Sequence, residues 1–298
     1  MAHAFTAENF GATFPERRAF LEEASAFNVI PVTRSLLADA WTPVTAFRLL
    51  AARDPHAFLF ESVEGGEREG RYSFLGRNPF LVFRARGEAV HAAGDDAQVV
   101  GKSGRPLDRL RETLGAFRSP VREGLPPFLS GAVGYLAYDA VRWLERLPDL
   151  GHAAPFEADL ELLFPYETAA FDNVARRLTL VANARIRSGE PPQRAYDEAE
   201  ARLSAMERAL AGSPVEPVTP SRPAEQDFPE AQSRAEFCQN VERAKMHIAA
   251  GDVFQVVLSR RRLGSCPASD LSVYRALRSV NPSPYMFLLR MEGWSAIG

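Results

Sequence analysis

The segment that decides the fold class reads Leu59-Phe60-Glu61-Ser62-Val63-Glu64-Gly65-Gly66 and continues to Gly70-Arg71-Tyr72-Ser73-Phe74-Leu75-Gly76. Short runs of aromatic and branched residues bounded by glycine or charge clusters are typical of β-strands. By this criterion we predict strands at Ala57–Val63, Arg71–Leu75, Phe80–Arg86 and Arg177–Ala184. Phe128–Asp139 is predicted as a strand interrupted by Gly131 and Gly134, which indicate a bulge or a close approach of two backbones.

Helical periodicity appears in the four segments Pro106–Phe117, Ala195–Leu210, Ser233–Gly251 and Asp270–Asn281. Ser233 and Glu236 form a capping-box pair, and Gly251 is a typical C-terminal cap. Gly212 is predicted to cap the second helix, and Pro282 ends the last one because proline cannot continue a helix.

Three strands are predicted near the end of the chain, at Asp252–Arg261, Tyr285–Arg290 and Trp294–Gly298. Residues 212–229 contain five prolines and no periodicity, which indicates an extended linker. We therefore predict an N-terminal domain at 27–211, a Pro-rich linker at 212–229 and the start of a second domain at 230–298. The mixture of elements predicts an α+β fold with largely antiparallel sheets packed with helices.

Composition excludes several classes of function. The formal net charge is −3, with basic and acidic residues interspersed, so we expect no nucleic-acid partner. No uncharged apolar run approaches ~18 residues, and no basic segment precedes an apolar run at the start, so a cytoplasmic protein without membrane contact is expected. We interpret Cys238 and Cys266 as structural thiols, with a disulfide between them as the open alternative. No His or Cys residues recur at zinc-ligand spacing.

No catalytic signature such as a P-loop or G-x-S-x-G is present. Two other segments stand out. In the first, Glu61 and Ser62 close an apolar strand just before a glycine turn. A carboxylate and a hydroxyl at this place could receive the ammonium and carboxylate of an amino acid. The alternative interpretation is that both residues are polar strand-end residues that face water.

The second segment is Asn281-Pro282-Ser283-Pro284-Tyr285-Met286-Phe287. Its prolines fix an extended entry into a strand. Alternate side chains among Tyr285, Met286 and Phe287 would line a pocket, and thioether and aromatic groups suit a flat ring. The alternative interpretation is ordinary core packing.

Taken together and in this order, the L-E-S and N-P-S-P-Y-M segments resemble the large-subunit family of anthranilate synthases. Further points of resemblance are Arg71–Phe74, Gly131–Asp139, Phe171–Asn173 and Gly251–Ser259. The last two of these are shared with sister enzymes that make para-aminobenzoate or isochorismate, so they indicate the superfamily only. The resemblance covers the chain from about Phe27 onward, except the linker. Glu69 and Ser130 depart from the family pattern.

The resemblance implies a binding site for the feedback inhibitor L-tryptophan. Glu61 would pair with its ammonium and Ser62 would hydrogen-bond its polar end. Pro284, Tyr285 and Met286 would frame the ligand, and Arg71 is a weaker candidate for its carboxylate. The two segments would face each other across a cavity sized for an indole. Because they lie on opposite sides of the linker, tryptophan would bridge two domains, and feedback would be a population shift.

The resemblance also implies a fold like the antiparallel sandwich of anthranilate and aminodeoxychorismate synthases, and a lyase activity. Chorismate and ammonia would give anthranilate and pyruvate for tryptophan biosynthesis, with Mg2+ as cofactor. A glutamine amidotransferase subunit would supply the ammonia.

The magnesium ligands and acid–base groups are expected beyond Gly298. This sequence would therefore be incomplete at its C-terminus and inactive alone. A terminal strand at Gly298 would also expose an unpaired edge, unless it is short and paired. Two other interpretations stay open: aminodeoxychorismate synthase component I, and a naturally short, non-catalytic tryptophan-binding module.

Overall fold

The computed structural model describes residues 10–62, 70–148, 158–212 and 232–298. The chain divides into two compact units, one formed by residues 1–215 and 274–298 and the other by residues 216–273. The predicted turn at Gly65-Gly66, the departure at Glu69 and nearly all of the predicted linker lie outside the described residues.

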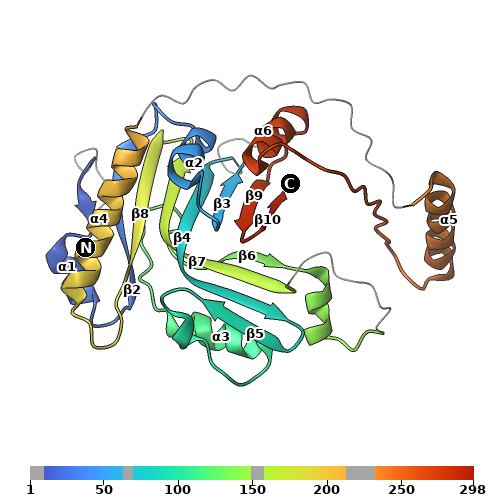
Figure 1. Cartoon of the computed structure of the whole chain (residues 1–298), viewed down its shortest axis with the longest axis horizontal. Helices are drawn as coiled ribbons and strands as arrows, with labels where there is room; N and C mark the ends of the chain where they lie inside the picture. The colour runs from blue at the N-terminus through green and yellow to red at the C-terminus, as the bar shows by residue number, and fades with distance from the viewer. Residues whose placement is uncertain (1–9, 63–69, 149–157, 213–231) are drawn as a thin grey trace. The chain divides into compact units, whose positions relative to one another are not determined.

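The first unit is built on one ten-stranded sheet, whose described strands pair antiparallel in the order β1-β2-β8-β7-β4-β3-β9-β10 (Figure 1). Strand β5 pairs with β4, and β6 pairs with β7. The strands are β1 (Thr13–Phe14), β2 (Val29–Leu37), β3 (Ala57–Glu61), β4 (Tyr72–Arg86), β5 (Ala89–Ala93), β6 (Val133–Leu136), β7 (Leu160–Asp172), β8 (Arg177–Arg185), β9 (Met286–Met291) and β10 (Trp294–Ile297).

Helices cover the sheet. They are α1 (Arg17–Glu23), α2 (Pro43–Ala51), α3 (Pro106–Ala116), α4 (Pro192–Leu210) and α6 (Asp270–Val280), with short 3-10 turns at Ala97–Val99 and Tyr138–Trp143. Helix α4 lies along β8 and β2, and α2 lies against β4 and β3. The buried residues of α4 recur every three or four positions from Ala195 to Leu210, as its periodicity predicts. The predicted α+β class is confirmed.

Strands β4 and β7 form the spine of the sheet, paired from Tyr72 opposite Asp172 to Ala85 opposite Leu160. β3 lies beside the first half of β4, and β5 lies beside the second half. The prediction of two strands in this region is wrong, because the register only shifts between Pro79 and Leu81. A bulge accommodates a proline that cannot donate a ladder hydrogen bond, so the strand continues through it.

The segment Phe128–Asp139 is mostly not a strand, since only Val133–Leu136 pairs with β7. The predicted close approach is confirmed at Gly134, where an added Cβ would lie 1.9 Å from the carbonyl oxygen of Glu161. Helix α4 also ends differently, because its C-cap is Ala211 in a right-handed conformation and not Gly212.

The second unit contains α5 (Arg234–Ala250), which has both hydrogen bonds of the predicted capping box and ends at Gly251 with φ +82°. None of its residues is buried. The predicted strand at Asp252–Arg261 is wrong, because these residues pair with no described strand and Phe254 is 93% exposed. An alternating pattern forms a stable strand only when a neighbouring strand pairs with it.

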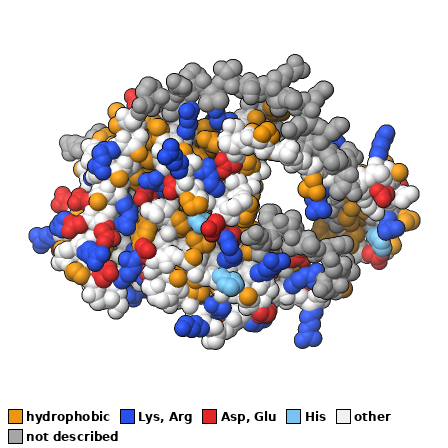
Figure 2. All heavy atoms as spheres, in the orientation of Figure 1, with side chains coloured by type: hydrophobic (Ala, Val, Ile, Leu, Met, Phe, Trp, Pro, Cys, Tyr) orange, Lys and Arg blue, Asp and Glu red, His pale blue; other side chains and the backbone are white. Residues whose placement is uncertain are grey.

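On the face of the first unit drawn in Figure 2, basic and acidic side chains are interspersed, in keeping with a formal net charge of −3. Within the described ranges, none of the helices has the length and apolar character that crossing a bilayer requires.

Candidate functional site

The two segments singled out in the sequence lie side by side, because β3 and β9 are paired strands of the same sheet (Figure 1). Glu61 lies directly opposite Met286 in the register. The hydroxyl of Ser62 donates a hydrogen bond of 2.7 Å to the carbonyl oxygen of Pro284. Both segments belong to the first unit, so the sheet continues across the predicted domain boundary. The boundaries at 211, 229 and 230 stay predictions.

Glu61 is a buried acid with two partners on helix α6. Its side chain accepts a 2.6 Å hydrogen bond from the Tyr274 hydroxyl at Oε2, and Arg278 Nε lies 3.3 Å from the same oxygen. Burial raises the pKa of Glu61, although the Tyr274 hydrogen bond and the Arg278 charge both favour the carboxylate. Burial and the neighbouring acid also raise the pKa of Tyr274, which therefore stays a neutral donor.

The three framing residues of the second segment face different surroundings. Met286 is buried, while Pro284 and Tyr285 are exposed, Tyr285 by 75%. Since Met286 and Glu61 are directly paired, their side chains lie on the same face of the sheet. One apolar and one acidic side chain therefore line this face together.

Arg71 is engaged by another strand. Its guanidinium binds both carboxylate oxygens of Asp172 on β7, the shortest contact being 2.8 Å, and stacks 4.9 Å from the Tyr72 ring centre. Burial opposes the charge of Asp172, but Arg71 and the amides of Ala175 and Val174 outweigh it and lower the pKa of Asp172. β7 and β3 flank β4 on opposite sides, so Arg71 is held on the side away from Glu61.

Sequence reasoning missed Tyr274 and Arg278 as members of the site. They are four positions apart on α6, so both project from one helix face, just before the N-P-S-P-Y-M segment. A tyrosine and an arginine at this spacing could have indicated a buried acid as their common partner.

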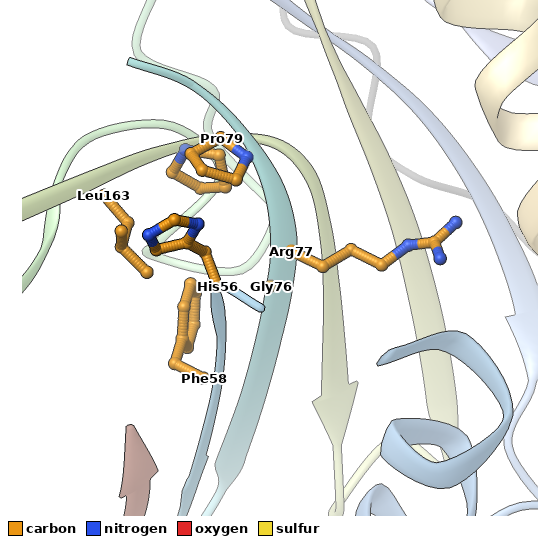
Figure 3. A pocket seen from close by; sticks show the side chains of 7 residues that line it. His56, Phe58, Gly76, Arg77, Pro79 and Leu163 are labelled. Carbon is orange, nitrogen blue, oxygen red and sulfur yellow. The ribbon is translucent and has the colours of Figure 1, made fainter. Parts of the chain in front are cut away.

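A narrow pocket lies nearby between β3, β4 and β7 (Figure 3) and is lined by His56, Phe58, Gly76, Arg77, Pro79, Leu163 and Pro165. It offers no volume to a water-sized molecule. The His56 ring lies between Phe58 and Pro79, with its Nε2 atom buried and without a hydrogen-bond partner, and burial lowers the pKa of His56. This pocket is packed and is not the cavity predicted for an indole. Near Glu61, the side chains of Tyr274 and Arg278 both contact Oε2 of the acid.

The described residues contain no group of three or more His, Cys, Asp or Glu side chains that could hold a metal ion. They therefore do not fit Mg2+. Cys238 and Cys266 are unpaired and exposed.

The fold and the two paired segments indicate the class of protein to which the chain belongs. The sequence pattern of the chorismate binding enzyme family matches residues 55–298, and the chain belongs to this family. It is 41% identical to anthranilate synthase component 1 of Mycolicibacterium smegmatis over 92% of this chain and 53% of that protein. It is 40% identical to the same-named protein of Mycobacterium tuberculosis over 94% of this chain and 55% of that protein. The resemblance predicted from the sequence is confirmed.

Two solved structures share the fold. Anthranilate synthase component I of Streptococcus pneumoniae matches with a TM-score of 0.56 and 23% identity, over 85% of this chain and 54% of that one. The menaquinone-specific isochorismate synthase of Escherichia coli matches with a TM-score of 0.51 and 15% identity, over 94% of this chain and 54% of that one. The chain spans about half the length of the curated relatives it matches.

Proposed function

We propose that this chain is the effector-binding part of an anthranilate synthase component 1. The complete protein is a lyase that converts chorismate and ammonia to anthranilate and pyruvate in tryptophan biosynthesis. The observation that carries the proposal is the 41% identity to a protein of that name over 92% of the chain.

The relatives are named component 1, and this number implies a second component. We propose that the present protein also works with such a second subunit. That subunit is a glutamine amidotransferase that releases ammonia. Mg2+ is the proposed cofactor of the complete protein. A cytoplasmic location is part of the same proposal.

L-Tryptophan is the proposed feedback inhibitor, and its site is formed by Glu61, Ser62, Pro284, Tyr285 and Met286. Two contacts support this assignment: the opposed pair Glu61 and Met286, and the hydrogen bond from Ser62 to Pro284. The acid supplies a partner for the ammonium, and the apolar thioether beside it offers a surface for the indole. Enclosing an aromatic side chain contributes roughly 2–3 kcal/mol before ordering costs, so the polar end must also be matched.

The test uses the complete protein with chorismate, ammonia and Mg2+. We expect anthranilate to appear by its fluorescence with an equal amount of pyruvate, and L-tryptophan to lower the rate while D-tryptophan does not. Formation of aminodeoxychorismate without pyruvate would contradict the proposal. Residues 1–298 alone are expected to form no anthranilate, since the relatives are about twice as long.

A further inference from the structure

The proposed tryptophan site lacks a partner for one of the ligand's two charges. A free amino acid carries an ammonium and a carboxylate, and each must find a counter-charge when it leaves water. Glu61 provides the counter-charge for the ammonium. Arg71, the candidate for the carboxylate, already binds Asp172 with two nitrogens. The inference below rests on the proposed function and identifies the missing cation.

Arg278 is the cation nearest to Glu61 among the described residues that contact it. Its Nε atom is 3.3 Å from Glu61 Oε2, yet this nitrogen is buried without a well-aligned hydrogen bond. The side chain is 40% exposed, whereas that of Glu61 is 3% exposed. The guanidinium therefore extends from the buried acid toward solvent.

One of the two carboxylate oxygens of Glu61 is not engaged by Tyr274 or Arg278. The contacts from Tyr274 and Arg278 both go to Oε2. Oε1 carries neither of them, and a carboxylate can accept through both of its oxygens. Tyr274 is fully buried, so its hydroxyl holds the acid in a fixed position.

We propose that Arg278 binds the carboxylate of the amino-acid effector while Glu61 Oε1 receives its ammonium. The opposite charges of this pair are close together, as are the two charges on the α-carbon of a free amino acid. The planar guanidinium suits a carboxylate because it can donate two parallel hydrogen bonds. The site is then selective for intact amino acids over amines or acids that carry the same indole ring.

The test is calorimetric titration of the full-length protein with L-tryptophan and with tryptamine, which lacks the carboxylate. Removing one charge-assisted contact costs roughly tenfold or more in affinity. Arg278→Gln should therefore weaken L-tryptophan binding by at least about tenfold and leave tryptamine binding within about twofold. Arg71→Gln is the matched control, and it should bind L-tryptophan as the unaltered protein does.

Arg278→Lys keeps the cation, loses the paired donors and guards against a loss of folding in the glutamine variant. We expect its affinity for L-tryptophan to lie between that of the unaltered protein and that of Arg278→Gln. The inference is overturned if Arg278→Gln binds L-tryptophan normally, if it loses both ligands equally, or if the selective loss belongs to Arg71→Gln. Failure of the unaltered protein to bind L-tryptophan would instead overturn the proposed function.

Discussion

Burial of the Glu61 carboxyl group beneath α6 raises its pKa, so this residue ionises less readily in the folded chain than in the unfolded one. The folded state binds the proton more tightly, and this contribution to stability is fully present below the pKa of the unfolded chain. It is lost as the pH rises through the raised pKa. Above the raised pKa the ionised acid thus costs stability, which is common for residues kept for binding.

Replacing the acid with an uncharged amide should remove this cost. We expect Glu61→Gln to gain thermal stability relative to the unaltered chain as the pH rises from about 4 to about 8. Thermal denaturation of both proteins across this range, followed by circular dichroism, measures the difference. A difference in Tm that does not change with pH would contradict the expectation.

The Ser62 hydroxyl fixes the backbone of the N-P-S-P-Y-M segment through Pro284. Ser62→Ala should weaken L-tryptophan binding by about fivefold, because a neutral hydrogen bond contributes about 1 kcal/mol. Titration calorimetry on the full-length protein gives the affinity. Ser25→Ala is the control, since Ser25 also donates to a carbonyl oxygen, that of Glu22, but lies just after the end of α1 and outside the proposed site. An unchanged affinity in Ser62→Ala would remove Ser62 from the site.

At the level of single residues, the sequence predicted that the segments around Glu61 and Met286 lie together. It did not predict the contacts from α6 that position Glu61. Glu61, Ser62 and Met286 could be singled out because each interrupts or completes an apolar strand pattern. Arg71 could not be excluded, because its partner Asp172 is 101 positions away. Tyr274 and Arg278 were missed because helical periodicity does not indicate which strand a helix face covers.

Among the elements, β6 depends most directly on one glycine. At Gly134 its backbone approaches β7 so closely that a Cβ would meet the backbone at Glu161 and Leu162. Backbone atoms of a central strand cannot move aside as the end of a flexible side chain can. The pairing of β6 with β7 therefore requires glycine at this position.

Gly134→Ala should lower the free energy of unfolding by about 1–3 kcal/mol or more, as overpacking does. Gly115→Ala is the control, because Gly115 is helical, exposed and has nothing within 4 Å of an added Cβ. It should stabilise the chain by roughly 0.5–1 kcal/mol through helix propensity. Urea denaturation measures both changes, and wild-type stability in Gly134→Ala would show that β6 can shift.

Four helices were predicted from strong local signals, whereas α1 and α2 were missed, α2 despite its capping box at Thr42 and Thr45. The capping box of α5 and the prolines of α3 and α6 mark helix ends from the sequence alone. Strands β2 and β7 escaped detection because both of their faces are buried, which removes the alternation of polar and apolar residues. Asp252–Arg261 shows the reverse, since it alternates without a described partner strand.

For the molecule as a whole, every described residue of the proposed site belongs to the first unit. Residues 1–298 should therefore bind L-tryptophan without the rest of a longer protein. A ligand that binds only the folded state stabilises it by about 2.7 kcal/mol at one hundred times its Kd. Scanning calorimetry should show Tm rising with L-tryptophan and not with D-tryptophan. An unchanged Tm at saturating L-tryptophan would mean that the site needs further residues.

The pairing of β3 with β9 joins residues that are far apart in the chain, since Ser62 and Pro284 are separated by 222 positions. During synthesis on the ribosome, β3 emerges long before its partner. Until β9 arrives, the edge of β3 can pair with other chains, as unpaired strand edges do. Pieces that stop before α6, including the predicted domain at 27–211, should therefore aggregate on expression, and recombinant fragments should be designed to retain residues 274–291.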